Sequence, residues 1–353
     1  MRSMRSRLGT IGVAVLGLGG ASCQSQYESP FSVPAAAPLP SAATLIYVSN
    51  GYDGARSVGP RELFAIDDRG GPPSRLTACA SRVPACEVVE AAPAPDGNRV
   101  AMRRRVDADR DSIVEPDEDD GIYVVDLMRG IEGRTISTKQ TTGLDWSPLD
   151  DILVYSALGE GGLEDLYSAF ANGAEDGNRT STADVRERRF RFDPLGRTLV
   201  YERSAPSQRS EVWLYRNLVL QLRLTNNSAV DLPSTLLPGT HYMLGSDADP
   251  DYSPDGTAVV FRRLTGPGQA GRGAWELMTV NTANGGDLRS LTPGPAAYRS
   301  APDWGPKGIA FVEIPVDGST AQLVVLDPAV GGGRRVVHTQ TSSFAMDAPR
   351  WIP

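Results

Sequence analysis

Histidine, lysine and cysteine are scarce in this sequence of 353 residues. Two histidines, His241 and His338, are too few for a metal centre built from several imidazoles. Of the 35 basic residues only Lys139 and Lys307 are lysines, so the remaining 33 are arginines. With 43 acidic residues the net charge is −8, which argues against a nucleic-acid-binding surface.

Long apolar runs are also missing. The stretch from Leu8 to Ala21 has about 14 residues, whereas a helix that crosses a bilayer needs about 20. Three arginines precede this stretch. The small residues Gly20-Ala21-Ser22 lie at its end, directly before Cys23. A basic, then apolar, then small-residue order is typical of an export signal, which we place at residues 1–22.

The end of this signal resembles the bacterial lipobox, in which a diacylglycerol is attached to a cysteine that becomes the first mature residue. The resemblance implies lipidation of Cys23, with Gly20 standing where that family prefers leucine. Gln24 in place of Asp implies an outer-membrane lipoprotein, periplasmic or surface-exposed, by the enterobacterial sorting rule. Plain secretion and an uncleaved anchor are the alternatives. Residues 23–43, rich in Pro, Ala and Ser, predict an extended tether to the membrane.

The other two cysteines, Cys79 and Cys86, lie close together in the sequence. A pair of cysteines in an exported protein favours a disulfide that pins a small loop. Two free buried thiols are the alternative.

A repeated Pro-centred turn organises residues 44–353. Its six prolines are spaced 46 to 60 residues apart, which suits propeller blades that carry insertions. Pro fixes φ at the second turn position, and Asp-Gly completes the reversal. The prolines are Pro95, Pro148, Pro194, Pro254, Pro306 and Pro353.

Each of the first five turns is followed by two short runs of β-branched or aromatic residues, such as Val259-Val260-Phe261 and then Trp275 to Val280. Such runs predict strands, and no segment has helical periodicity. The run Thr44 to Val48 has no turn before it, and the last turn, Trp351-Ile352-Pro353, has no strand after it. Joining these two ends completes one blade. The prediction is therefore an all-β, six-bladed propeller closed by pairing of the N- and C-terminal strands. An open solenoid is the alternative.

The repeats resemble those of the TolB family, which are also found beside prolyl oligopeptidase domains. The signature is an aromatic-Ser-Pro-Asp-Gly turn followed by an apolar strand that ends in an aromatic residue, and Asp251 to Phe261 matches it almost fully. The resemblance covers residues 44–353 and implies the fold. The α/β domain that precedes the propeller in TolB has no counterpart here, nor does the Gly-x-Ser-x-Gly elbow of a hydrolase.

One acidic segment suggests cation chemistry. Between Asp107 and Asp120, eight of 14 residues are acidic, with acids at loop positions 1, 3, 5, 9 and 12. This spacing suits calcium, and it resembles thrombospondin type 3 and EF-hand-like loops. Ser112 departs from their pattern, which has Gly at the sharp bend. A solvated loop without an ion is the alternative. The expected ligands are Asp107, Asp109, Asp111, Ile113 through its carbonyl, Glu115 and Glu118.

Other charged groups are weaker candidates. Arg103-Arg104-Arg105 adjoins the acidic loop, and we interpret these arginines as counter-charges to its carboxylates. An anion-binding patch is the alternative. Asp145, Asp251 and Asp303 share one repeat position, which predicts a repeated structural hydrogen bond. Residues 226–247, with His241, are interpreted as a long loop over one propeller face.

Three functions follow. The leading hypothesis is a non-catalytic, lipid-anchored envelope scaffold that binds a protein or glycan, with structural calcium and no catalytic residues. The alternatives are an enzyme acting at the central channel, of the calcium-dependent lactonase or polysaccharide lyase type, and a structural spacer. The fold alone names no ligand.

Overall fold

The structure is a computed structural model that describes residues 39–41, 44–50, 60–79, 85–111, 114, 118–128, 131–137, 139–216, 220–227, 236, 242–268, 273–329, 332–341 and 346–353. The export signal, Cys23 and most of the tether lie outside these residues, as do Ile113, Glu115 and His241. The regular secondary structure of the described residues is β-strand without α-helix, which confirms the predicted all-β class. No helix in this part of the chain has the length and apolarity needed to cross a membrane.

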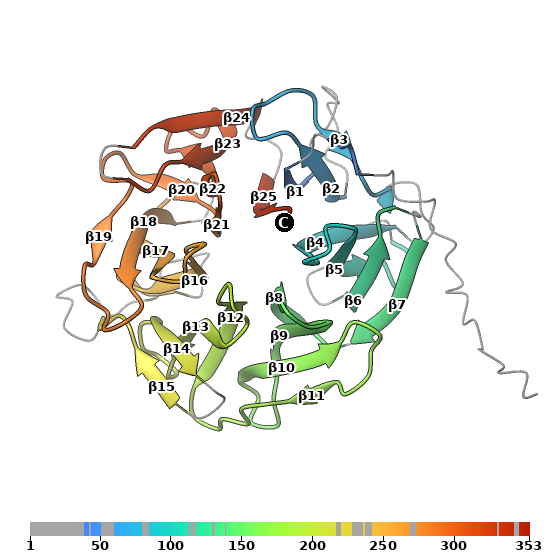
Figure 1. Cartoon of the computed structure of the whole chain (residues 1–353), viewed down its shortest axis with the longest axis horizontal. Helices are drawn as coiled ribbons and strands as arrows, with labels where there is room; N and C mark the ends of the chain where they lie inside the picture. Colours follow the sequence, from blue (N-terminus) through green and yellow to red (C-terminus); the bar gives the residue numbers. More distant parts are fainter. Residues whose placement is uncertain are drawn as a thin grey trace, which may run out of the picture. The chain divides into compact units, whose positions relative to one another are not determined.

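The strands form six antiparallel sheets, or blades, that follow one another around a ring (Figure 1). The first blade contains β1 (Leu45–Ser49), β2 (Glu62–Ile66), β3 (Ser74–Arg75) and β25 (Met346–Trp351). The second contains β4 (Cys86–Pro93), β5 (Arg99–Val106), β6 (Asp119–Asp126) and β7 (Ile131–Ser137). The third contains β8 (Thr141–Trp146), β9 (Ile152–Leu158), β10 (Glu164–Phe170) and β11 (Gly177–Asn178).

The remaining three blades repeat this plan. The fourth contains β12 (Arg186–Phe192), β13 (Thr198–Ser204), β14 (Glu211–Arg216) and β15 (Leu220–Arg223). The fifth contains β16 (Asp247–Tyr252), β17 (Ala258–Gly266), β18 (Ala274–Asn281) and β19 (Arg289–Ser290). The sixth contains β20 (Ala297–Arg299), β21 (Asp303–Gly305), β22 (Gly308–Pro315), β23 (Thr320–Leu326) and β24 (Arg334–Thr341). We call β4, β8, β12, β16, β21 and β25 the inner strands, because each contacts the next around the ring.

The first blade is built from both ends of the sequence, as predicted. β25 pairs antiparallel with β1, with Leu45 opposite Trp351 and Ile46 opposite Arg350. Beyond the strand, the Ile352 backbone N–H donates to the Thr44 carbonyl oxygen at 2.9 Å. The pairing closes the ring and confirms a six-bladed propeller with no open edge between its first and last blades.

In the second to sixth blades, the Pro turns connect the inner strand to the next strand of the blade. In the turn after β16, the Gly256 N–H donates to the Ser253 carbonyl oxygen at 2.8 Å, and Gly256 has φ of 71°. The Ser253 Oγ accepts the Ala258 N–H at 2.9 Å, which fixes the start of β17. Glycine occupies this left-handed position without steric penalty, which explains the repeated Asp-Gly pair.

The hydrophobic core lies between neighbouring blades. Between the fourth and fifth blades, for example, Val200 and Leu214 pack with Tyr252 and Phe261. All five residues of β1 are buried, because the blade is covered on both faces. Burial of a Val, Leu or Phe side chain contributes about 1.5–3 kcal/mol. Sheet-to-sheet packing therefore holds the inner strands, and the charged side chains they carry, in fixed positions.

Candidate functional site

Several inner strands are interrupted by β-bulges near their first residues. The pairing register shifts at Thr142/Leu144 in β8, at Arg188/Arg191 in β12 and at Ala248/Asp251 in β16. A bulge re-aims a side chain out of the regular alternation of a strand. In this propeller the bulges change which side chains reach the axis.

Four bulge residues have positive φ: Gly143 (68°), Arg189 (58°), Asp249 (50°) and Ala348 (48°). Glycine adopts this conformation freely, but a non-glycine residue in a sparsely populated region costs on the order of 1–3 kcal/mol. Two of the strained residues, Arg189 and Asp249, carry opposite charges and come from adjacent inner strands.

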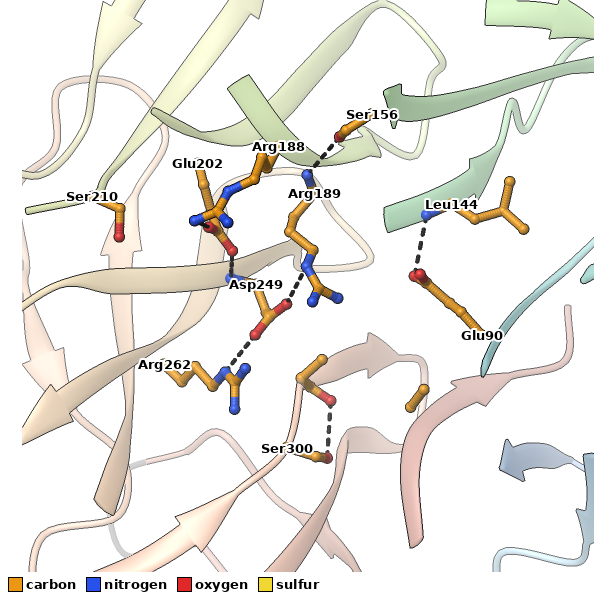
Figure 2. Close-up of polar contacts among 12 residues, drawn as sticks. Glu90, Leu144, Ser156, Arg188, Arg189, Glu202, Ser210, Asp249, Arg262 and Ser300 are labelled. Atoms are coloured by element: carbon orange, nitrogen blue, oxygen red, sulfur yellow. Dashed lines mark hydrogen bonds and ion pairs between the residues drawn. The ribbon is translucent and has the colours of Figure 1, made fainter. Parts of the chain in front are cut away.

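Asp249 lies between two guanidinium groups (Figure 2). Its carboxylate forms an ion pair with Arg189 Nε at 3.2 Å and accepts a hydrogen bond from Arg262 Nε. Burial opposes the ionisation of Asp249, but Arg189 and Arg262 outweigh it and hold the pKa of this carboxyl below its usual range. The backbone N–H of Asp249 donates to Glu202 Oε1 at 2.7 Å. This arrangement joins β12, β13, β16 and β17 around one charged cluster.

A second ion pair crosses three blades. Arg191 Nη2 lies 3.4 Å from Glu90 Oε1, and Arg191 Nη1 donates to the Leu144 carbonyl oxygen at 3.0 Å. Glu90 also accepts the Leu144 N–H at 3.1 Å (Figure 2). Although burial raises the pKa of Glu90, the field of Arg191 and other arginines lowers it overall. The inner strands β4, β8 and β12 are thus held together by one buried charge pair.

These groups line one end of a central channel, which we call the basic cavity. Its volume is about 210 Å³. Seven arginines and three carboxylates line it, together with Val89, Ala301, Pro302, Ala348 and Pro349. The arginines are Arg61, Arg103, Arg105, Arg189, Arg191, Arg262 and Arg350, and the acids are Glu90, Asp249 and Asp347.

The other end of the channel is acidic, and we call it the acidic cavity. It has a volume of about 190 Å³ and is lined by Asp145, Asp193, Asp251 and Asp303 near the Pro turns. Arg350 lines both cavities. It forms ion pairs with Asp145 and, at 3.3 Å, with Asp303.

Three of these aspartates join neighbouring blades. Asp145 accepts the Phe192 N–H at 2.8 Å, Asp251 accepts the Trp304 N–H at 2.6 Å, and Asp303 accepts the Trp351 N–H at 2.7 Å. The repeated structural hydrogen bond predicted for these positions is therefore confirmed. Burial, followed by the charge of Asp303, raises the pKa of Asp251 to about 7. Burial likewise raises the pKa of Asp303.

The acidic loop follows β5. Carboxylate oxygens of Asp107, Asp109 and Glu118 lie within 4.8 Å of one another. Asp107 is buried, Glu118 Oε1 accepts the Ala108 N–H at 2.7 Å, and Asp109 Oδ1 accepts the Asp111 N–H at 3.1 Å. Three converging carboxylates suit a hard cation.

The remaining sequence candidates have varied surroundings. Arg103 and Arg105 line the basic cavity, whereas Arg104 lies over the Tyr123 ring at 4.0 Å. The structure joins Cys79 and Cys86 by a disulfide. His338, on β24, lies beside Tyr47, with 6.0 Å between ring centroids, and burial lowers its pKa.

Sequence reasoning missed the arginines of the inner strands. Arg189 and Arg191 belong to the run Arg186-Glu187-Arg188-Arg189-Phe190-Arg191. Such a charged run inside a strand of a buried blade was the available signal, because charged residues are rarely buried without a partner.

Comparison with known proteins gives a likeness of fold. No family model matches the chain, and no curated protein matches its sequence. TolB from Acinetobacter baumannii superposes with a TM-score of 0.62 at 16% identity, over 89% of this chain and 68% of that one. Putative TolB from Agrobacterium tumefaciens gives 0.58 at 14% identity, over 89% and 100%. The structural neighbours are TolB-like six-bladed propellers. A chain of the nidogen/laminin complex also matches, with a TM-score of 0.60 at 10% identity over 88% of this chain and 98% of that one.

Proposed function

We propose that this chain is a non-catalytic propeller of the bacterial cell envelope that binds a protein or glycan partner. In this proposal a lipid on Cys23 anchors it to the outer membrane, residues 23–43 form the tether, and the acidic loop holds a structural calcium ion. The observation that carries the proposal is the closed ring of six blades, which resembles TolB structures over most of the chain. A rigid ring presents loops in fixed positions, as binding scaffolds require.

The envelope location is supported by two independent features. The order of charges and small residues before Cys23 is that of an export signal with a lipobox. The neighbours in fold include TolB from two bacteria. That a propeller of this kind can belong to a protein–protein assembly is supported by the likeness to a chain of the nidogen/laminin complex.

The calcium proposal rests on the convergence of Asp107, Asp109 and Glu118. Three carboxylates so close together repel one another, and calcium would remove that repulsion because its usual ligands are carboxylate and carbonyl oxygens. The ion would tie Asp107 and Asp109 at one end of the loop to Glu118 at the other. Its role is structural, because it would fix the path of the loop.

Membrane fractionation of bacteria that express Cys23→Ser tests the anchor. The parent chain and a matched Ser25→Ala control are expected to sediment with membranes, whereas most of the Cys23→Ser protein is expected in the soluble fraction. Equal sedimentation of all three would contradict lipid anchoring.

Since binding is assigned to the propeller, the soluble variant should still capture the same envelope partner after cross-linking as the parent does. A chain unfolded by heat before mixing is the negative control, and equal capture by it would contradict the scaffold role.

A further inference from the structure

We propose that the basic cavity of the central channel is a binding site for a small oxyanion, whose carboxylate or phosphate oxygens are held by guanidinium groups from β5, β12 and β17. This site is separate from the outer loops and from the acidic loop, and the proposal goes beyond the scaffold function. Three observations carry it: the balance of charge, the burial of the arginines and the strained backbone that presents them.

Positive charge exceeds negative charge in the described residues of the basic cavity. Arg61 and Arg105 share Glu87, at 2.8 and 3.1 Å, with Asp347 nearby. Arg350 is paired at the opposite, acidic end. Of the other arginines that line the cavity, Arg189 and Arg262 share the single carboxylate of Asp249, and Arg191 pairs with Glu90.

Most of these arginines are shielded from bulk water. Arg103, Arg191 and Arg262 are 9%, 5% and 9% exposed. Buried charge of one sign is unfavourable unless a counter-charge accompanies it. The side chain of Arg189 is 30% exposed, more than those of Arg191 and Arg262. An anion in the cavity would lie among Arg189 and these buried arginines.

The backbone conformation fixes the positions of two of these charged groups. Arg189 and Asp249 both adopt positive φ within bulges, and Asp249 fixes Arg189 by their 3.2 Å ion pair (Figure 2). Strain of this kind is found where the surrounding structure must hold a side chain in one direction. The result is a guanidinium whose orientation is set before any ligand arrives, which lowers the entropic cost of binding.

The chemistry of the walls defines the class of ligand. A guanidinium offers paired N–H donors that match two oxygens of a carboxylate or phosphate. The cavity, at about 210 Å³, is smaller than the roughly 300–1,000 Å³ of sites for drug-sized ligands. The ligand is therefore a compact anion such as a phosphate group or a small polycarboxylate. A neutral sugar has no charged oxygens to pair with these guanidinium groups.

Calorimetric titration of the full chain at low ionic strength tests this site, with inorganic phosphate, citrate and glucose as probes. We expect phosphate, citrate or both to bind, glucose not to bind, and added sodium chloride to weaken the affinity. Binding of phosphate alone would identify a phosphate group as the ligand, and binding of citrate alone a polycarboxylate. Absence of heat with both anions, or binding of glucose alone, overturns the proposal.

Variants locate the binding. Arg189→Gln is expected to weaken anion binding at least tenfold. Arg197→Gln, an equal charge change at an exposed turn beyond the other end of β12, should leave it unchanged. If Arg189→Gln fails to fold, Arg189→Lys retains the charge but loses the paired donors and should weaken binding severalfold. A folded Arg189 variant that binds as tightly as the parent overturns the proposal.

Discussion

Gly305 has a hydrogen atom where any other residue would place a Cβ, and Trp351 fills the adjoining space. A Cβ built on Gly305 would lie 2.2 Å from Cγ of the Trp351 ring. The same tryptophan donates from Nε1 to the Gly308 carbonyl oxygen at 3.0 Å and from its backbone N–H to Asp303. The packing of β25 against the sixth blade therefore requires glycine at position 305, where a side chain would overlap Trp351.

Gly305→Ala is expected to destabilise the propeller. The added methyl group must displace Trp351 from its contacts, and overpacking of this kind costs roughly 1–3 kcal/mol. Urea unfolding followed by tryptophan fluorescence measures the change. Gly266→Ala is the matched control, because a Cβ there meets nothing within 4 Å. Identical unfolding midpoints for the two variants would contradict the close packing at Gly305.

At the scale of strands, the repeats could be predicted from the sequence because the residues that form a turn are close together in the chain. Pro and Asp-Gly specify each reversal within a few residues, and short β-branched runs specify the strands. The bulges of β12 and β16 were not readable. Arg189 and Asp249 are aimed at the axis by contacts with strands from other blades, and no local pattern encodes those contacts. The blade count was thus predictable, whereas the basic cavity was not.

The acidic loop is an element with its own test. Removal of one carboxylate by Asp109→Ala should lower calcium affinity at least tenfold, because the ligands of such a loop act together. Calorimetric titration with calcium measures the affinity. Asp317→Ala, which removes an exposed acid from the turn between β22 and β23, is the control and should bind calcium like the parent. If titration of the parent chain with calcium produces no heat of binding, the proposal of a calcium ion in this loop is contradicted.

On the scale of the whole propeller, charge is divided along the channel. Arginines dominate one end and aspartates the other, and Arg350 lies at the junction. The sequence predicted the aspartates as structural because they recur at one repeat position. It could not predict their mutual effect, which arises only when six blades bring them around one axis.

That mutual effect makes the stability of the ring depend on pH. Because the pKa of Asp251 is raised to about 7 in the folded state, its protonated form stabilises the fold. This contribution is complete below the unfolded pKa of about 3.9 and is lost as pH rises through 7. Asp251→Asn retains an oxygen for the Trp304 N–H and cannot ionise. Relative to the parent, this variant should be more stable at pH 8 than at pH 5, by roughly 2–3 kcal/mol.

Thermal or urea unfolding at the two pH values measures this difference. Asp150→Asn, at an exposed position of the turn after β8, serves as the control and should show no such change between pH 5 and pH 8. An Asp251→Asn variant whose advantage over the parent is the same at both pH values would show that Asp251 is ionised throughout that range in the folded chain.

The pairing of β25 with β1 also sets the order of events during synthesis. The two strands are separated by nearly the whole propeller sequence, so the first blade has an unpaired edge while the chain is still growing on the ribosome. The other five blades take all their strands from consecutive stretches and can form as they emerge. Ring closure is therefore a late, long-range step with a large loop-closure entropy. A ribosome that stalls before Met346 would release a chain with exposed strand edges, which is a substrate for proteases and chaperones.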